Sequence, residues 1–135
     1  MADALQVELV AADRVVWSGE ATRVIARTTE GDVGVLRGHA PMLSLLKEGV
    51  VDILDTEGQT WVAACDAGFL SVANDRVSIL AERAELSHDI DLEKARHDLE
   101  RALAAGEDSG SSEEEVRRLE IRRLQARVRA AERAS

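Results

Sequence analysis

The sequence predicts an antiparallel β-sandwich or barrel followed by an antiparallel helical hairpin. Over the first 86 of the 135 residues, apolar and polar side chains alternate in short runs bounded by Gly, Asn and Asp, a pattern typical of strands joined by tight turns. After residue 87 the apolar residues recur every three to four positions, which is the period of an amphipathic helix. We therefore expect a β-domain over residues 1–86 and a helical hairpin over residues 87–135.

The alternation is clear at the N-terminus. Leu5, Val7 and Leu9 are expected on one face of a strand, with Gln6 and Glu8 on the other, because successive side chains of a strand point to opposite faces. Similar runs cover residues 15–17, 22–27, 50–54, 60–65, 69–73 and 76–81. These runs are the candidate strands of the β-domain.

Two turns have special backbone chemistry. Asn74-Asp75 lies between two of the candidate strands and predicts a tight hairpin turn, because Asn and Asp tolerate positive φ. The segment 31–43, GDVGVLRGHAPML, contains several glycines and the only proline of the chain, Pro41. It predicts a strand, a sharp corner and then an apolar run that begins at the proline.

The first helix is expected over about residues 91–105. Ser87 or Asp89 can cap its start, while Asp91 and Glu93 suit the positive N-terminal end of a helix. Its apolar positions recur at helical spacing: Leu92, Ala95, Leu99, Ala102 and Leu103.

A polar connector over residues 106–112 leads to a second helix, expected over about residues 113–133. Ser112 and Glu115 have the spacing of a capping box at its start. The apolar residues of this helix form a narrow stripe: Val116, Leu119, Ile121, Leu124, Val128 and Ala131. The connector is the expected hinge of the hairpin.

Composition narrows the function classes. The chain has 17 basic and 26 acidic side chains, a formal charge of −9, and only one Phe, two Trp and no Tyr. Nucleic-acid binding needs positive potential and base-stacking aromatics, so we expect no nucleic-acid partner. No apolar run approaches the roughly 18 residues of a membrane span, so membrane association is expected to be indirect. A lone cysteine, Cys65, fits a reducing cytoplasm and is expected to be a small buried hydrophobe.

We expect no catalytic or metal-binding residues. His39 lies in the predicted corner without a nucleophile or an orienting carboxylate in a recognisable motif, so we expect it to satisfy backbone groups there. His39, His88 and His97 show no paired ligand spacing, and Cys65 lies in an apolar run.

The charge of the second helix differs from that of the rest of the chain. Residues 1–112 carry a balance of −11, whereas residues 113–135 carry +2. The basic residues are Arg117, Arg118, Arg122, Arg123, Arg127, Arg129 and Arg133. They form either a solvated face with pairs four residues apart or a cationic surface that binds carboxylates through the planar guanidinium fork.

Several motifs resemble those of the epsilon subunit of F-type ATP synthases. They are GDVGVLRGHAPML at 31–43, AGFLSV at 67–72, VSILAE at 77–82, AE at 84–85 and ID at 90–91, in the order and spacing of the family. The family usually has Gly-Gly where this chain has Ala67-Gly68. The resemblance covers the chain from about residue 5 to its end and implies a β-sandwich of about ten strands followed by two helices.

The resemblance also implies a function. Members are non-catalytic subunits of the central stalk that couple proton flow to ATP synthesis, bind the gamma subunit and the c-subunit ring, and lie peripherally on the cytoplasmic face of the cell membrane. By this analogy His39, Pro41 and Met42 contact a partner. The helical hairpin inhibits ATP hydrolysis by docking on the catalytic alpha and beta subunits, here through Arg122, Arg123 and Arg127.

Some members of the family bind ATP through an [IL]-D-x-x-R-A pattern. Residues 90–95, IDLEKA, match it with Lys94 in the place of the arginine, and Glu85 and Arg101 fall at further family positions. The resemblance thus implies a weak ATP site at Glu85, Asp91, Lys94 and Arg101. The alternative for Asp91 is a helix cap, and the alternative function for the whole chain is a stand-alone small-molecule or nucleotide-binding module.

Overall fold

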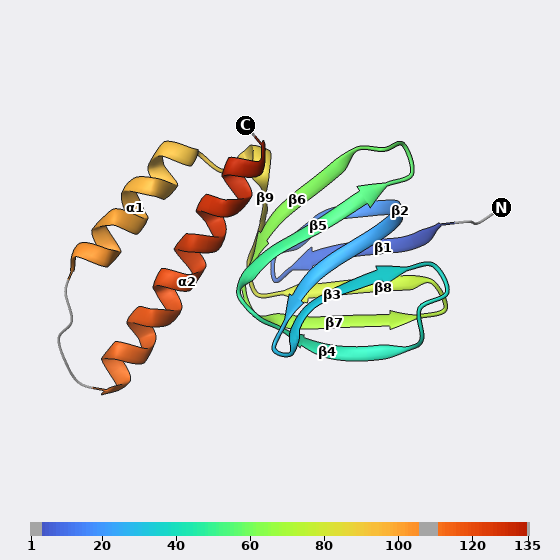
Figure 1. The fold of residues 1–135 in the computed structure, drawn as a ribbon, viewed down its shortest axis with the longest axis horizontal. Coiled ribbons are helices and arrows are strands. Elements are labelled where there is room, and N and C mark those ends of the chain that lie inside the picture. The colour runs from blue at the N-terminus through green and yellow to red at the C-terminus, as the bar shows by residue number, and fades with distance from the viewer. Residues whose placement is uncertain (1–3, 106–110, 135) are drawn as a thin grey trace.

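The computed structural model describes residues 4–105 and 111–134, and these form a β-sandwich followed by two helices (Figure 1). Nine strands lie within the described residues, against the ten or so that the family resemblance implies. They are β1 (Leu5–Ala11), β2 (Arg14–Thr28), β3 (Gly31–Leu36), β4 (Met42–Leu46), β5 (Gly49–Asp55), β6 (Thr60–Cys65), β7 (Gly68–Ala73), β8 (Arg76–Ala81) and β9 (Ala84–Leu86).

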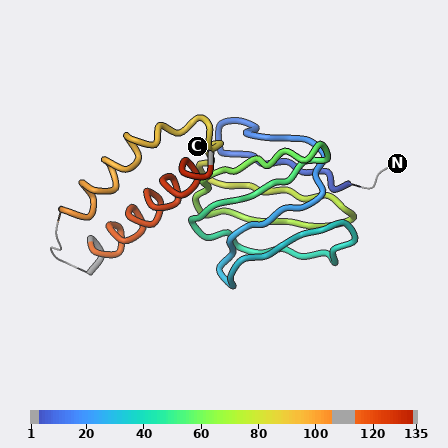
Figure 2. The backbone as a smooth tube through the Cα atoms, turned by 45° about the horizontal axis from the view of Figure 1, so that its top comes forward, coloured from blue at the N-terminus to red at the C-terminus, as the bar shows by residue number. Residues whose placement is uncertain are grey.

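The strands form one ladder in the order β1-β8-β7-β4-β2-β5-β6-β9, with β3 also on β2. Because β1 pairs with both β8 and β2, the sheet closes on itself and makes two packed layers (Figure 2). The pairings are antiparallel except that of β1 with β8, which is parallel. The sequence pattern predicts the antiparallel hairpins between neighbouring strands but carries no signal for this long-range parallel pair.

The sandwich core follows the predicted alternation. Leu5, Val7 and Leu9 are buried, while Gln6 and Glu8 are exposed. The same core contains fully buried side chains from both layers, including Val24, Val35, Ile53, Leu70, Val72, Val77 and Ile79. Burial of this apolar surface is the main stabilising contribution to the domain.

The two predicted turns have the expected backbone. Asn74 and Asp75 join β7 to β8 with φ of 52° and 63°, as a two-residue hairpin turn with both central residues at positive φ requires. Pro41 directly precedes β4, and Gly38 in the corner has a φ of 85°. The Gly38 amide donates to Asp75 Oδ1 at 2.7 Å, which fixes the corner against the β7–β8 turn.

The helical part begins with a short 3₁₀ helix, η1 (Ser87–Asp89), and continues into α1 (Leu92–Ala104) and α2 (Ser111–Ala134). The prediction that Ser87 or Asp89 caps the first helix is wrong, because both residues belong to η1. Asp91 is the cap, and its Oδ1 accepts from the Lys94 amide at 3.2 Å. Most of the predicted connector and the side chain of the proposed capping residue Ser112 lie outside the described residues.

The second helix lies between the first helix and the sandwich (Figures 1 and 2). Its C-terminal half is buried on two sides, because Ala126 and Ala130 are as inaccessible as the predicted stripe residue Ala131. Val116, at the other end of the predicted stripe, is 67% exposed. The narrow stripe therefore describes only part of the buried surface of α2.

The hairpin packs on the outer face of β5 and β6. Cross-strand pairs place Val50 beside Ala64 and Asp52 beside Val62 on this face, while Val51 and Ile53 point into the sandwich core. The apolar residues Val62 and Ala64 form a second buried cluster with Ile90, Ala95, Val128, Ala130 and Ala131. In the described part of the chain, neither helix is long and apolar enough to cross a membrane.

Candidate functional site

Four arginines of α2 reach four carboxylates of the sandwich. We call Arg122, Arg123, Arg127 and Arg133 the arginine row, and Glu48, Asp52, Asp66 and Glu85 the acidic platform. The closest pairs are Arg122 Nε–Glu48 Oε1 at 3.1 Å, Arg123 Nε–Asp66 Oδ2 at 3.3 Å, Arg127 Nε–Glu85 Oε1 at 2.7 Å and Arg133 Nη2–Asp52 Oδ2 at 2.9 Å. The predicted docking residues thus bind the chain's own β-domain in this compact state.

Three platform carboxylates are nearly covered. The side chains of Glu48, Asp66 and Asp52 are 8%, 12% and 13% exposed, and each contacts an arginine of the row. A carboxylate taken out of water is costly unless it is paired. Removal of α2 would take these arginine partners away from Glu48, Asp52 and Glu85, whereas Asp66 would keep its hydrogen bond from Arg83.

Asp66 is shared between the sandwich and the hairpin. Arg83 Nε donates to its Oδ2 at 3.0 Å, while Arg123 Nε lies 3.3 Å from the same oxygen without the alignment of a hydrogen bond. Burial raises the pKa of the Asp66 carboxyl, and the positive charges of Arg123 and Arg83 oppose this. The neighbouring Glu48 raises the pKa further.

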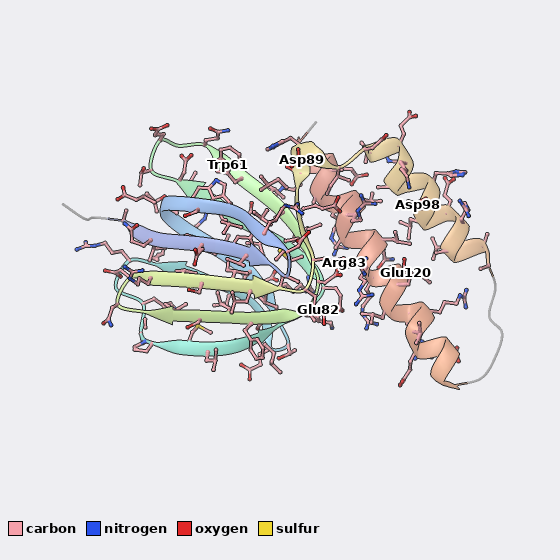
Figure 3. All side chains as sticks on the ribbon, turned by 180° about the vertical axis from the view of Figure 1, so that it is seen from behind. Trp61, Glu82, Arg83, Asp89, Asp98 and Glu120 are labelled. Carbon is pink, nitrogen blue, oxygen red and sulfur yellow. The ribbon has the colours of Figure 1, made fainter. Side chains whose placement is uncertain are left out.

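A cavity of about 520 Å³ lies between the sandwich end and the two helices. Arg83 at the sandwich end, Asp98 of α1 and Glu120 of α2 line it, and Figure 3 shows them around this junction. Its acidic and basic lining residues are Asp13, Arg14, Asp66, Arg83, Glu85, Asp98, Glu120, Arg123 and Arg127. Because several of its arginines already contact carboxylates, an anion in the cavity must compete for them.

The structure only partly assembles the predicted ATP-binding residues. Glu85 lines the cavity and binds Arg127, whereas Asp91 caps α1, Lys94 Nζ contacts Asp98 Oδ2 at 3.1 Å, and Arg101 is an exposed residue of α1. Asp91, Lys94 and Arg101 do not line the cavity.

Asp98 is the residue that sequence reasoning missed at this place. The hydrogen bond from Lys94 lowers the pKa of the Asp98 carboxyl, and the charges of Lys94, Arg101 and Arg127 lower it further. The hydrogen bond that Arg127 donates to Glu85 in turn raises the pKa of the Arg127 guanidinium. The spacing of Lys94 and Asp98, four residues apart on one helix, was a signal for their pair.

The segment between β3 and β4, which holds the predicted partner-contact residues His39 and Pro41 and leads into Met42, lies at the end of the sandwich opposite the helices (Figure 1). His39 Nδ1 lies 2.7 Å from the Ala40 carbonyl oxygen, within the corner. Pro41 is exposed, and Met42 is half-buried at the start of β4. Pro41 and the hydrogen bond from the Gly38 amide to Asp75 restrain the backbone of this loop.

A second candidate surface is apolar. Leu43 and Leu45 of β4, Phe69 of β7 and Leu80 of β8 are 72%, 52%, 48% and 48% exposed. Leu45 pairs with Phe69 and Phe69 with Leu80 in the sheet, so these three side chains form one row across it. We call these four residues the apolar sheet face.

A groove of about 760 Å³ runs along this face. Leu45, Phe69 and Leu80 line it together with Glu48 and, from the hairpin, Arg122. The sequence predicted an apolar run that begins at Pro41 but not this row, because the partners of a strand are not readable from its own sequence.

The expectation that Cys65 is a small buried hydrophobic residue agrees with the structure. Its side chain is 2% exposed, and burial raises the pKa of its thiol to about 12. Across residues 4–105 and 111–134, no three His, Cys, Asp or Glu side chains gather in an arrangement that could hold a metal ion.

Comparisons with known proteins identify the family. Residues 4–87 match the family described as ATP synthase, Delta/Epsilon chain, beta-sandwich domain. The ATP synthase epsilon chain of Streptomyces avermitilis is 53% identical over 117 residues, which cover 87% of this chain and 94% of that one. The ATP synthase epsilon chain of Nocardia farcinica is 46% identical over 129 residues, which cover 95% of this chain and 90% of that one.

Solved structures share the fold. The chain superposes on one from the OSCP/F1/c-ring structure of Euglena gracilis mitochondrial ATP synthase with a TM-score of 0.84 and 22% identity, covering 97% of this chain and 82% of that one. A chain of the central stalk and c-ring structure of Tetrahymena thermophila mitochondrial ATP synthase superposes with a TM-score of 0.60 and 14% identity. The match covers 96% of this chain and 95% of that one. On the sequence matches, the chain belongs to the family of ATP synthase epsilon chains, which are non-catalytic subunits of that complex.

Proposed function

We propose that the chain is a central-stalk rotor subunit that couples proton flow to ATP synthesis in a proton-translocating F-type ATP synthase. The observation that carries the proposal is a closed sandwich with two separate candidate contact surfaces, the apolar sheet face and the His39 corner. A β-sandwich with a close-packed core resists deformation and suits the transmission of torque. The names of its relatives and the titles of its structural neighbours support this role.

The gamma subunit is the proposed partner of the apolar sheet face. Four large apolar side chains that are about half exposed or more, gathered on one surface, mark a protein contact when they form a continuous patch. The c-subunit ring is the proposed partner of the corner at His39, Pro41 and Met42, because this loop lies at the other end of the sandwich from the hairpin (Figure 1). Association with the cytoplasmic face of the cell membrane would then be peripheral and indirect.

Co-purification tests the gamma contact. Phe69→Ser removes the central side chain of the apolar row and should reduce recovery of the gamma subunit with the chain. Val15→Ser is a matched control, because Val15 is 55% exposed in β2 and does not line the groove. Equal recovery of gamma with both variants would contradict the proposed contact.

Proton pumping tests the corner. His39→Ala removes the ring that contacts the Ala40 carbonyl oxygen, and we expect weaker ATP-driven proton pumping in membrane vesicles with little change in ATP hydrolysis by the detached soluble enzyme. Unchanged pumping would remove His39 from the coupling contact.

Inhibition of ATP hydrolysis is proposed for the hairpin. The arginine row pairs with the acidic platform in the compact state, and the same guanidinium groups can bind carboxylates of the alpha and beta subunits when the hairpin is extended. Two states that use the same charges differ little in energy, so a partner can shift the population between them.

ATP binding is the second candidate function, as a regulatory site or as the activity of a stand-alone nucleotide-binding module. The observation that favours it is the cavity of about 520 Å³ with Arg14, Arg83, Arg123 and Arg127 in its lining. Binding should be weak, because Glu85 and Asp66 already hold three of these arginines. Titration calorimetry at millimolar ATP with the unsubstituted chain and with Lys94→Arg tests it, and absence of heat from both would reject the site.

A further inference from the structure

Arg122 belongs to two surfaces at once. Its Nε binds Glu48 Oε1 at 3.1 Å as part of the arginine row, and the same residue lines the groove along the apolar sheet face. Among the described residues that line this groove, Arg122 is the one contributed by the hairpin. The wall of the groove is therefore complete only while α2 lies on the sandwich.

The position of Glu48 explains why the position of Arg122 matters for a partner in the groove. It also lines the groove, and its side chain is 8% exposed in the compact state. Arg122 is 45% exposed and lies over it. If α2 moves away, a carboxylate without its guanidinium remains at the rim of an apolar groove.

We propose that an apolar partner in the groove, the gamma subunit of the proposed function, binds the compact state more tightly than the extended state because Arg122 neutralises Glu48. In the compact state the partner covers a paired carboxylate and the aliphatic stem of an arginine, both of which tolerate burial. In the extended state it must either bury an unpaired carboxylate or leave that rim uncovered. The inference rests on the proposed function.

Thermodynamic linkage makes the effect reciprocal. If the docked hairpin strengthens partner binding, the bound partner strengthens hairpin docking by the same factor. Gamma bound in the groove thus stabilises the docked position of the hairpin, the proposed inhibitor of ATP hydrolysis, without contacting the parts of the hairpin remote from Arg122. The Arg122–Glu48 pair is the positioning contact through which this occurs.

Charge argues for a different protein rather than a second copy as the occupant. The chain carries a formal charge of −9, so two copies repel each other. The lining of the groove itself is balanced, with Lys47 and Arg122 against Glu48 and Glu82. A second copy would show itself as concentration-dependent dimerisation that Phe69→Ser abolishes. That result would overturn the choice of partner.

The test measures the affinity of the full chain for the isolated gamma subunit. Arg122→Gln leaves Glu48 without its ion pair, and we expect gamma binding to weaken about tenfold. The double variant Arg122→Gln with Glu48→Gln removes the unpaired carboxylate and should recover most of the affinity. Arg118→Gln is the control, since Arg118 pairs with Glu114 within α2.

Hydrogen exchange of α2 with and without gamma supplies the reciprocal measurement. Gamma should slow exchange of α2 in the unsubstituted chain, and this protection should shrink in Arg122→Gln. Exchange protection of the sandwich strands in Arg122→Gln, compared with that in the unsubstituted chain, shows whether the single variant is folded.

The outcomes separate the two proposals. If Phe69→Ser leaves gamma affinity unchanged, the proposed contact on the apolar sheet face fails. If Phe69→Ser weakens binding but Arg122→Gln does not, or if the double variant binds no better than Arg122→Gln, the linkage is overturned while the contact stands.

Discussion

Arg127 of α2 and Glu85 of β9 form a two-pronged ion pair across 42 residues of sequence. Arg127 donates from Nε to Glu85 Oε1 at 2.7 Å and from Nη2 to Oε2 at 3.3 Å. Two parallel bonds of this kind need the planar guanidinium fork. The pair joins a residue proposed to bind nucleotide with one proposed to inhibit hydrolysis, so these two proposed functions would compete for the same groups.

This pair predicts a specific double-mutant result. Both side chains are partly exposed, at 28% and 38%, so we expect a coupling of only about 1 kcal/mol between Arg127→Lys and Glu85→Gln in the free energy of unfolding. Urea denaturation of the two single variants and the double variant measures it. Additive effects would show that the fork contributes no net stability.

Gly68 is predicted to be intolerant of a side chain. A Cβ at this position would overlap the Leu80 carbonyl oxygen and crowd Ala81 Cα across the β7–β8 ladder. We expect Gly68→Ala to lower the free energy of unfolding by about 1–3 kcal/mol, measured by urea denaturation.

Gly34→Ala is the matched control, because a Cβ at Gly34 meets no atom within 4 Å and the residue also lies in a strand. We expect it to change stability by less than about 0.5 kcal/mol. Equal effects at the two glycines would contradict the steric account.

The pH dependence of stability should reveal Asp66. Burial raises the pKa of its carboxyl above the ordinary value of 3.8, so the folded chain holds this proton more tightly than the unfolded chain. The corresponding stability is present at low pH and is lost as pH rises through the raised pKa. Relative to the unsubstituted chain, Asp66→Asn should therefore gain stability as pH rises from about 3 to 7.

Asp55 gives the opposite sign and serves as the control. A hydrogen bond from Trp61 Nε1 lowers the pKa of its carboxyl, so its stabilisation is present above pH 3.8 and is lost as pH falls through the lowered pKa. Asp55→Asn should lose stability relative to the unsubstituted chain as pH rises from about 2 to 5. Slopes of the same sign in the two variants would refute the assignment for Asp66.

Removal of residues 112–135 should raise ATP hydrolysis by the assembled enzyme and leave assembly intact. Replacement of Arg122, Arg123 and Arg127 together by Gln should reproduce much of this increase, because the extended hairpin would then lack the charges proposed to bind acidic segments of the catalytic subunits. Steady-state hydrolysis rates of the reconstituted enzyme measure both. High salt should produce the same change, since the Debye length falls to about 3 Å at 1 M.

A charge-matched control replaces Arg117, Arg118 and Arg129, which are arginines of α2 outside the arginine row. It should leave the hydrolysis rate near that of the unsubstituted enzyme. If truncation does not raise hydrolysis, the hairpin is no inhibitor in this protein. If truncation raises the rate of ATP hydrolysis but replacement of Arg122, Arg123 and Arg127 does not, inhibition is steric rather than electrostatic.

The sequence by itself determined the local structure. The alternation at Leu5, Val7 and Leu9, the Asn74-Asp75 turn and the proline-started strand at Pro41 all depend on neighbouring residues and on backbone preferences, so their signals lie within a few positions. The family motifs likewise are short strings read in order. Composition gave the acidic body and the basic second helix.

Tertiary structure alone decided which of these residues meet. The parallel pairing of β1 with β8, the burial of Ala130 between α1 and the sandwich, and the contact of Arg122 with Glu48 join segments far apart in the chain. No local pattern encodes them, because the energy of a long-range contact depends on how both surfaces are packed and desolvated. For the same reason, the place of Asp98 in the lining of the cavity came only from the fold.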